Sequence, residues 1–264
     1  MAKIERLNKP ELVEYCKNVG LETKGKSKNV LMEEAQKYGN NEIKEAIVAG
    51  KGLELLTKKT EVLAEEYATN LNSKIENRKQ EMKADDNSHY LIYRVLGITT
   101  TEGQLIDEYQ NTGRFLYKYA GSFLEEAASL CLQFKNVDGG KTLIENNHGQ
   151  RPKTFEIDFL DGKNAIEIKW RDATTDGDHI TKEHTRVKSI ESHGYIPIRV
   201  MFYYPQREQA IRIQATLKTI YEGVKGQYYG GEEAWEFIKN YSGFDLKEIL
   251  TKIADKRTPE NGDK

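Results

Sequence analysis

The chain has 264 residues, enough for one large domain or for a small and a medium domain with a substantial core. Its 40 lysines and arginines nearly balance 42 aspartates and glutamates, and the net charge of −2 argues against a general basic coat for nucleic acid. The same charge balance is compatible with a site-specific enzyme whose basic groups are confined to one cleft. Two cysteines, Cys16 and Cys131, are too few for a disulfide framework and are expected to be buried thiols in a reducing compartment. The charged first residues do not form a signal peptide, and no apolar run has membrane-spanning length, so a cytoplasmic location is expected.

Residues 1–40 predict a small module made of a helix, an extended link and a second helix. Pro10 suits the first turn of a helix, and Gly20 suits a left-handed cap at its end. The pattern Leu-x-x-Tyr-Cys-x-x-x-Gly-Leu-x-Thr-x-Gly-x-x-x-x-x-Leu, from residue 12 to 31, resembles SAP-like modules that bind DNA. The resemblance implies phosphate contacts from Lys24, Lys26 and Lys28. The alternative is a helical appendage with a solvated lysine loop.

Residues 41–110 predict a helical region. Apolar residues recur at helical spacing from Leu53 to Ile75 with few breakers, which indicates a long helix that packs on its own domain or on a second subunit. Further helical segments are expected at 91–98 and 102–109. Asn111-Thr112-Gly113-Arg114 predicts a connector to the next domain.

Residues 111–254 predict an α/β domain, and a charged tail covers 255–264. The helix expected over 115–134 has a broad apolar face, as burial against a sheet requires. The fold class is therefore a small mixed sheet flanked by helices, with a helical N-terminal part. Beside the hairpin described next, the domain is expected to hold strands at 141–145 and 195–204 and helices near 179 and at 206–223, 234–241 and 246–254.

Alternating polar and apolar residues flank Asp161-Gly162-Lys163-Asn164 and predict a β-hairpin over residues 154–171. Side chains of a strand alternate between two faces. One face of each strand is therefore expected to be apolar, with Phe155, Ile157 and Phe159 on the first strand and Ile166, Ile168 and Trp170 on the second.

The opposite face of this hairpin gathers charge. A turn centred on Gly162 and Lys163 places Asp158 across from Glu167, and like charges directly opposite each other destabilise a strand pair. A divalent cation between the two carboxylates removes that conflict, and Mg²⁺ is commonly held in this way. Lys169, the next residue on that face, is expected opposite Glu156, where it could polarise a water or balance charge at phosphorus. The alternative is an amphipathic hairpin with a solvated acidic face.

Asp158 followed nine residues later by Glu167-Ile168-Lys169 resembles the signature of the PD-(D/E)xK nucleases, although Ile157 stands in place of the proline. The resemblance implies that Asp158, Glu167 and the Ile168 carbonyl bind Mg²⁺ and that Lys169 orients the attacking water. Gly121-Ser122-Phe123-Leu124-Glu125 resembles the glycine-x-x-x-glutamate helix of these nucleases, which implies a supporting catalytic role for Glu125. The alternative for Glu125 is an ordinary glutamate on a helix surface.

The segments on either side of the hairpin are candidates for DNA recognition. In the loop 146–153, Arg151 and Lys153 are expected to touch phosphates. The polar stretch 171–186 offers groups that read base edges or phosphates, namely Arg171, Thr174, Thr175, Asp176, His179, Lys182 and Arg186. Two alternatives remain for this stretch: a second metal site built from Asp176, Asp178, His179 and His184, or a helix cap at Asp178.

The stretch from Glu167 to Arg186, together with residues 197–214, resembles type II restriction endonucleases of the ApaLI kind. The resemblance implies a Mg²⁺-dependent homodimer that hydrolyses double-stranded DNA at a short palindrome and leaves 5′-phosphate ends. It also implies a cognate DNA methyltransferase that acts on the same site. The alternatives are a structure-specific repair or junction nuclease, and an inactive DNA-binding protein with a nuclease fold.

Overall fold

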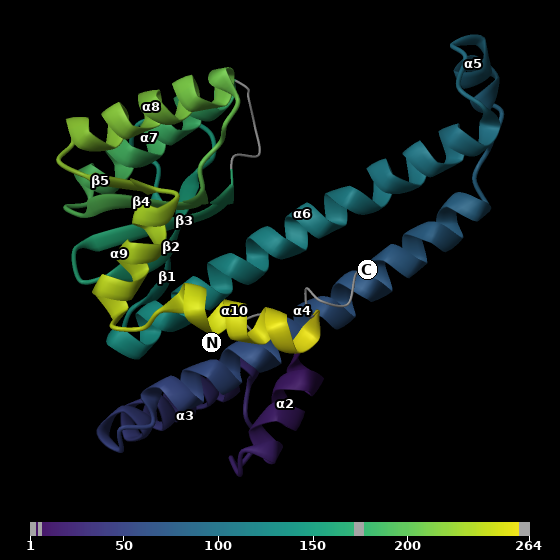
Figure 1. The fold of residues 1–264 in the computed structure, drawn as a ribbon. Coiled ribbons are helices and arrows are strands. Elements are labelled where there is room, and N and C mark those ends of the chain that lie inside the picture. Colours follow the sequence, from purple (N-terminus) through teal and green to yellow (C-terminus); the bar gives the residue numbers. More distant parts are fainter. Residues whose placement is uncertain (1–3, 5–6, 172–176, 259–264) are drawn as a thin grey trace. The chain divides into compact units, whose positions relative to one another are not determined.

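The computed structural model describes residue 4 and residues 7–171 and 177–258 (Figure 1). The chain folds into two compact units, one made of Met1–Thr60 with Glu125–Lys264 and the other of Glu61–Leu124. None of the helices in these described ranges is long and apolar enough to cross a membrane.

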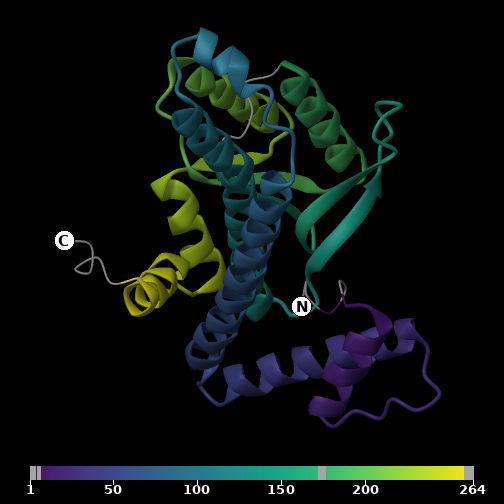
Figure 2. The ribbon, with the colours of Figure 1, turned by 90° about the vertical axis from the view of Figure 1, so that its right-hand side faces the viewer.

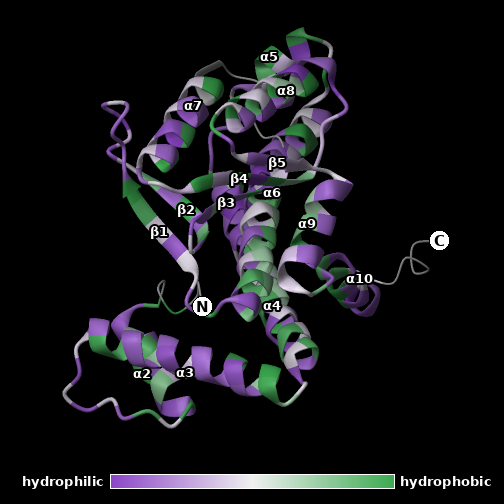
Figure 3. Ribbon diagram, turned by 90° about the vertical axis from the view of Figure 1, so that its left-hand side faces the viewer, coloured by the Kyte–Doolittle hydropathy of each residue, from purple (hydrophilic) through white to green (hydrophobic). Residues whose placement is uncertain are grey.

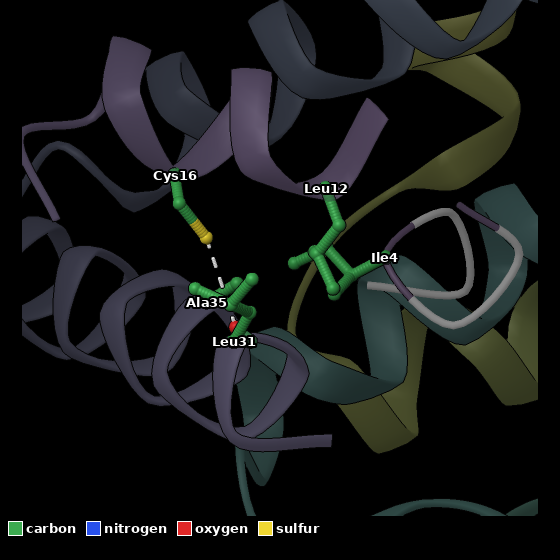
Figure 4. Packing of buried hydrophobic residues seen from close by; sticks show 5 residues of the cluster. All are labelled: Ile4, Leu12, Cys16, Leu31 and Ala35. Carbon is green, nitrogen blue, oxygen red and sulfur yellow. Dashed lines mark hydrogen bonds between the residues drawn. The ribbon is translucent and has the colours of Figure 1, made fainter. Parts of the chain in front are cut away.

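The first unit begins with α2 (Lys9–Asn18) and α3 (Lys28–Val48), joined by a non-helical link. A reciprocal cap starts α2, because Glu11 N donates to Asn8 Oδ1 at 3.0 Å and Asn8 N donates to Glu11 Oε2 at 2.8 Å. Ile4, Leu12, Cys16, Leu31 and Ala35 form the core between the two helices (Figure 4). Both helices alternate hydrophilic and hydrophobic residues around their circumference, as amphipathic helices do (Figure 3). The expected helix–link–helix order is present, and α3 continues through residue 40 to Val48.

The second unit contains α5 (Tyr90–Val95) and the facing parts of two long helices, α4 (Gly52–Lys83) and α6 (Thr100–Lys135). Tyr67 of α4 meets the rings of Tyr119 and Phe123 of α6 edge-on, with ring centroids 6.0 and 5.8 Å apart. Further along, Lys79 forms an ion pair with Glu108 at 2.9 Å. The pairing of α4 with α6 therefore combines aromatic packing with surface charge pairs.

The connector predicted at Asn111–Arg114 is wrong, because α6 is continuous through these residues. Gly113 inside a helix costs about 1 kcal/mol relative to alanine. Contacts between helices favour the continuous form: Arg78 of α4 donates to Asn111 Oδ1 through Nε at 3.2 Å and Nη2 at 2.8 Å. Tertiary contact outweighs local propensity at this point.

The first unit also holds a five-stranded sheet in the order β1-β2-β3-β4-β5. Its strands are β1 (Gly140–Glu145), β2 (Thr154–Asp161), β3 (Asn164–Arg171), β4 (Ile196–Tyr203) and β5 (Gln227–Gly230). The pairs β1–β2 and β2–β3 are antiparallel, and β3–β4 and β4–β5 are parallel. This mixed sheet with flanking helices confirms the predicted fold class. The sequence did not predict β5, which has only four residues and too short a pattern to reveal a period.

Helices cover both faces of the sheet (Figure 2). On one face lie α7 (Gly177–Ser192) and α8 (Glu208–Gly223), with Ile190 of α7 packed against Phe155, Ile157 and Ala165. On the other face lies α9 (Glu232–Ser242), whose Trp235 ring lies 4.3 Å from that of Phe202, and α10 (Leu246–Arg257) packs against α9. The buried face of each strand thus has a helix against it.

A β-bulge interrupts β2. Gly140 pairs with Leu160 but Thr142 pairs with Ile157, so β2 carries one extra residue at Asp158–Phe159. The hairpin register is the expected one from Phe159, which pairs with Ile166, to the turn. Because Ile166 follows Ala165 along β3, Phe159 lies on the face opposite to Phe155 and Ile157. The prediction that Phe155, Ile157 and Phe159 share a face is therefore wrong, and the bulge is the reason.

Candidate active site

Three carboxylates converge at the bulge. Glu125 near the C-terminal end of α6, and Glu156 and Asp158 of β2, each offer an oxygen atom within 4.8 Å of the other two. Asp158 is buried, at 6% exposure, and Glu125 is partly buried. An octahedral Mg²⁺ site with bonds of about 2.1 Å spaces its ligand oxygens by roughly 3 to 4 Å. The three carboxylates therefore have the donor chemistry for a hard divalent cation, and a small approach of their oxygens would reach the spacing that the ion requires.

Lys141 of β1 lies against two of these carboxylates. Its Nζ is 2.8 Å from Glu156 Oε1 and 3.2 Å from Glu125 Oε1. Burial raises the pKa of the Glu125 carboxyl, and the charge of Asp158 raises it further, while Lys141 and Lys169 oppose this change. Burial alone would lower the pKa of Lys141, but hydrogen bonding to Glu156 and the charge of Glu125 outweigh it, so the pKa of Lys141 is raised. The cluster therefore concentrates negative charge, which the Lys141 ammonium partly neutralises.

Backbone and side-chain donors of β3 hold Asp158 in place. Ile168 N donates to Asp158 Oδ2 at 2.8 Å, and Lys169 Nζ lies 3.4 Å from the same oxygen. Lys169 Nζ also donates to the Ile168 carbonyl at 3.0 Å. The carboxylate takes an amide that a regular ladder would pair with the neighbouring strand, which the bulge makes possible.

Glu167 lies next to this cluster without joining it. Its carboxylate is 2.5 Å from Lys169 Nζ and forms an ion pair with Arg186 of α7, so it faces α7. Glu167 is only 2% exposed, and its Oε2 has no hydrogen-bond partner in the part of the chain that the structure describes. A buried carboxylate oxygen without a donor is costly. The Oε2 atom of Glu167 is therefore suited to bind a cation or a water molecule held by a cation.

Lys169 joins the two groups of carboxylates, since its ammonium contacts both Asp158 and Glu167. The sequence predicted Asp158, Glu167, Lys169 and Glu125 as one site, and the structure brings all four into the same neighbourhood. It adds Glu156 and Lys141, which the sequence analysis did not select. Glu156 stands two residues before Asp158, so its position on the strand was a usable signal. Lys141 had none, because only the β1–β2 pairing brings it here.

Arg186 connects Glu167 to a buried ionic network. Arg186 also approaches Glu183, with 3.9 Å between Nη1 and Oε2. Glu183 accepts hydrogen bonds from Arg199 of β4 at 3.0 Å and from the hydroxyl of Tyr221 of α8 at 2.6 Å. Glu183, Arg199 and Tyr221 are nearly inaccessible to solvent. Arg186, expected to contact DNA, therefore points to Glu167 and Glu183 in this structure.

The other residues expected to contact DNA are distributed over several elements. Arg151 and Lys153 are exposed in the loop before β2, Lys182 is exposed on α7, and the Arg171 guanidinium lies 5.5 Å from the Trp170 ring. In the N-terminal link, Lys24 and Lys28 are exposed, whereas Lys26 forms an ion pair with Glu34 at 2.7 Å. Thr174, Thr175 and Asp176 lie outside the described residues, as do the side chains of Asp178 and His179. The helix expected near 179 begins at Gly177.

A mixed sheet between helices, with carboxylates and lysines gathered where β2 and β3 separate, defines a core of the nuclease type. The chain belongs to the ApaLI-like restriction endonuclease family, whose model matches residues 32–255. Neither the curated proteins nor the solved structures contain a match to the chain. Family membership makes the protein a site-specific DNA endonuclease, a hydrolase of phosphodiester bonds. Restriction endonucleases generally use a divalent metal, and Glu125, Glu156 and Asp158 are placed so that they could hold one.

Proposed function

We propose that this endonuclease is a type II enzyme that uses Mg²⁺ to hydrolyse both strands of duplex DNA at a short palindromic sequence. The observation that carries the proposal is the convergence of Glu125, Glu156 and Asp158 beside the Lys169 ammonium. Carboxylates supply the oxygen ligands that Mg²⁺ prefers, so these residues would hold the ion beside the substrate phosphate.

Each side chain of the site has a role in this proposal. Asp158, Glu125 and Glu156 would hold the Mg²⁺ in the acidic cluster, and Glu167 and the Ile168 carbonyl would supply further oxygen ligands from β3. When bound, Mg²⁺ supplies Lewis-acid stabilisation of the charge that develops on the phosphate oxygens. Lys169, at 3.4 Å from Asp158 and 2.5 Å from Glu167, holds the attacking water and balances negative charge at phosphorus. In-line attack leaves 5′-phosphate and 3′-hydroxyl ends.

Substitution of Asp158 or Lys169 tests this mechanism. We expect Asp158→Ala and Lys169→Ala to abolish cutting of long duplex DNA in Mg²⁺, with a loss of at least about 100-fold, the scale of a removed transition-state group. DNA binding, measured by fluorescence anisotropy, should largely survive. Lys163→Ala, in the exposed hairpin turn, is the matched control and should cut normally. Normal cutting by Asp158→Ala would rule out the proposed centre.

The fragments identify the kind of endonuclease. A site-specific enzyme gives a fixed set of bands from a defined plasmid, and sequencing of the ends reveals the site and the stagger. Cutting confined to branched DNA would instead indicate a repair or junction nuclease. A type II enzyme also implies a cognate methyltransferase that protects the same sequence, which resistance of methylated host DNA would reveal.

A homodimer is part of the proposal, because a palindrome presents two equivalent scissile phosphates and one chain supplies one set of catalytic residues. Exposed apolar side chains in the second unit support association: Leu91, Ile92, Val95 and Leu96, in and just after α5, are each at least 58% exposed. Sedimentation velocity on the purified protein measures the mass directly, and a strictly monomeric protein on its DNA would contradict this part.

DNA is proposed to contact three regions of the chain. The exposed Arg151, Lys153 and Lys182 are suited to phosphates, and Arg171 with the stretch 174–179 is proposed to read base edges. Arg186 would reach DNA only by leaving Glu167. Residues 1–40 are proposed as a SAP-like DNA-binding module, followed by a helical region to residue 110 and a nuclease domain over 111–254.

A further inference from the structure

Lys141 takes part in none of the roles described above, although it contacts the acidic cluster. Its ammonium contacts Glu156 and Glu125, two of the three converging carboxylates. The third, Asp158, has its own cation in Lys169. In this state the two ammonium groups provide the positive charge that lets three carboxylates lie within 4.8 Å of one another.

A divalent cation cannot share this position with Lys141. An ion bound between the three carboxylates would replace the ammonium as the partner of Glu125 and Glu156, and the two positive groups would repel each other at a few ångströms. The Lys141 side chain is long and flexible, with three donors on a single charged atom, so it can release the carboxylates without moving β1. Its side chain is 25% exposed, which gives the ammonium a path to solvent.

A released ammonium at the rim of a metal-bearing cluster is well placed for an anion. DNA brings phosphates to the same cluster, and a lysine binds phosphate as a point charge. We propose that Lys141 is an internal counter-ion: it holds Glu125 and Glu156 together in the metal-free protein, yields them to the metal, and turns to a phosphate of the bound DNA. The proposal rests on the proposed metal-dependent function and adds a residue that affects both metal affinity and DNA affinity.

The test compares metal affinity and DNA affinity in a variant that lacks this charge. Lys141→Met keeps the length of the side chain and removes the ammonium. We expect calorimetry with Mg²⁺ or Mn²⁺ alone, without DNA, to show about tenfold tighter metal binding than in the wild type, within the usual range of coupling between sites. Anisotropy with a short duplex in EDTA should show several-fold weaker DNA binding, because the carboxylates then face the phosphates unneutralised.

Two further variants make the outcome specific. Lys141→Arg keeps the charge and should restore wild-type metal affinity, and Lys163→Met, in the exposed hairpin turn, should change neither affinity. Lys141→Gln replaces the methionine variant if that one does not fold, and thermal unfolding with and without Mg²⁺ reports folding and metal binding together. Unchanged or weaker metal binding in the uncharged variants would overturn the role of Lys141. Absence of metal binding in the wild type, or its persistence in Asp158→Asn, would instead contradict the proposed centre itself.

Discussion

One extra residue in β2 determines how the acidic residues of this endonuclease are arranged. At the bulge, Asp158 turns its carboxylate to the amide of Ile168 and to Lys169, and comes within metal-binding distance of Glu125 and Glu156. In a regular strand, Asp158 would lie directly opposite Glu167. The bulge replaces that unfavourable pair with two groups of carboxylates that share Lys169.

Glu183 is a buried carboxylate in an ionic and hydrogen-bonded network. Its carboxylate is the partner of the buried Arg199 and accepts the Tyr221 hydroxyl. Burial raises the pKa of Tyr221, and the Glu183 charge raises it further. The tyrosine is therefore held as a neutral donor to a charged acceptor.

Removal of Glu183 tests this network. We expect Glu183→Ala to lower the free energy of unfolding by about 3 to 5 kcal/mol in a urea titration, since it leaves a buried guanidinium without its carboxylate. Glu191→Ala, on the exposed part of the same helix, should cost little. Equal effects of the two changes would show that Arg199 does not depend on Glu183.

At the scale of elements, Asp107 of α6 contacts His89, which precedes α5, and Tyr93 of α5. His89 Nε2 lies 2.9 Å from Asp107 Oδ2, and the Tyr93 hydroxyl donates to Oδ1 at 3.0 Å. The ring of Tyr90 and that of Tyr93 pack over Gly103, where a Cβ atom would come within 2.7 Å of Tyr93. Gly103 thus allows the short helix to approach the long one.

This attachment predicts a pH window for the second unit. The hydrogen bond to Asp107 raises the pKa of His89. Protonated His89 therefore stabilises the folded state fully below the ordinary histidine pKa, and this stabilisation is lost as the pH rises through the raised pKa. The hydrogen bond to His89 lowers the pKa of Asp107, so the stabilisation that the Asp107 carboxylate gives the folded state is lost as the pH falls through the lowered pKa. The pair therefore favours the folded state most between these two transitions.

Nuclear magnetic resonance can follow the titration of the His89 side chain. In Asp107→Asn the pKa of His89 should fall toward its ordinary value of about 6.5. An unchanged His89 titration in Asp107→Asn would show that the contact does not form in solution.

At the scale of the whole molecule, the family match covers most of the chain but not its first 31 residues. The match to the restriction endonuclease family begins at residue 32, after α2 and the lysine-rich link. The proposed DNA-binding module therefore lies mostly outside the matched region. Its exposed lysines, Lys24 and Lys28, can be removed without touching the core between α2 and α3.

The salt dependence of DNA binding tests the proposed module. We expect the double change Lys24→Ala and Lys28→Ala to weaken binding and to reduce the slope of log affinity against log salt by about 2, one for each lost phosphate contact. Cutting of saturated DNA should be unchanged. Lys37→Ala, exposed on α3, is the control. An unchanged slope in the double variant would show that Lys24 and Lys28 do not contact DNA phosphates.

The sequence by itself determined the local elements and the fold class. The hairpin with its turn at Gly162, the strand at 196–203 and the helices after it follow from alternation, helical periodicity and turn residues. These patterns are local because strand and helix geometry repeat over a few residues. The hairpin pattern sufficed to mark Asp158, Glu167 and Lys169 as neighbours, and the resemblance to PD-(D/E)xK nucleases added Glu125.

Only the tertiary structure decided how those neighbours are grouped. The bulge arises from the pairing of β2 with β1, which no periodicity within β2 reveals. That pairing brings Lys141 and Glu156 into the cluster with Asp158, while α7 turns Glu167 toward Arg186. The continuity of α6 likewise depends on α4. In each case, contacts between distant segments outweigh the local preferences of the sequence. The burial and the partners of a carboxylate or a glycine depend on the segments that pack against it.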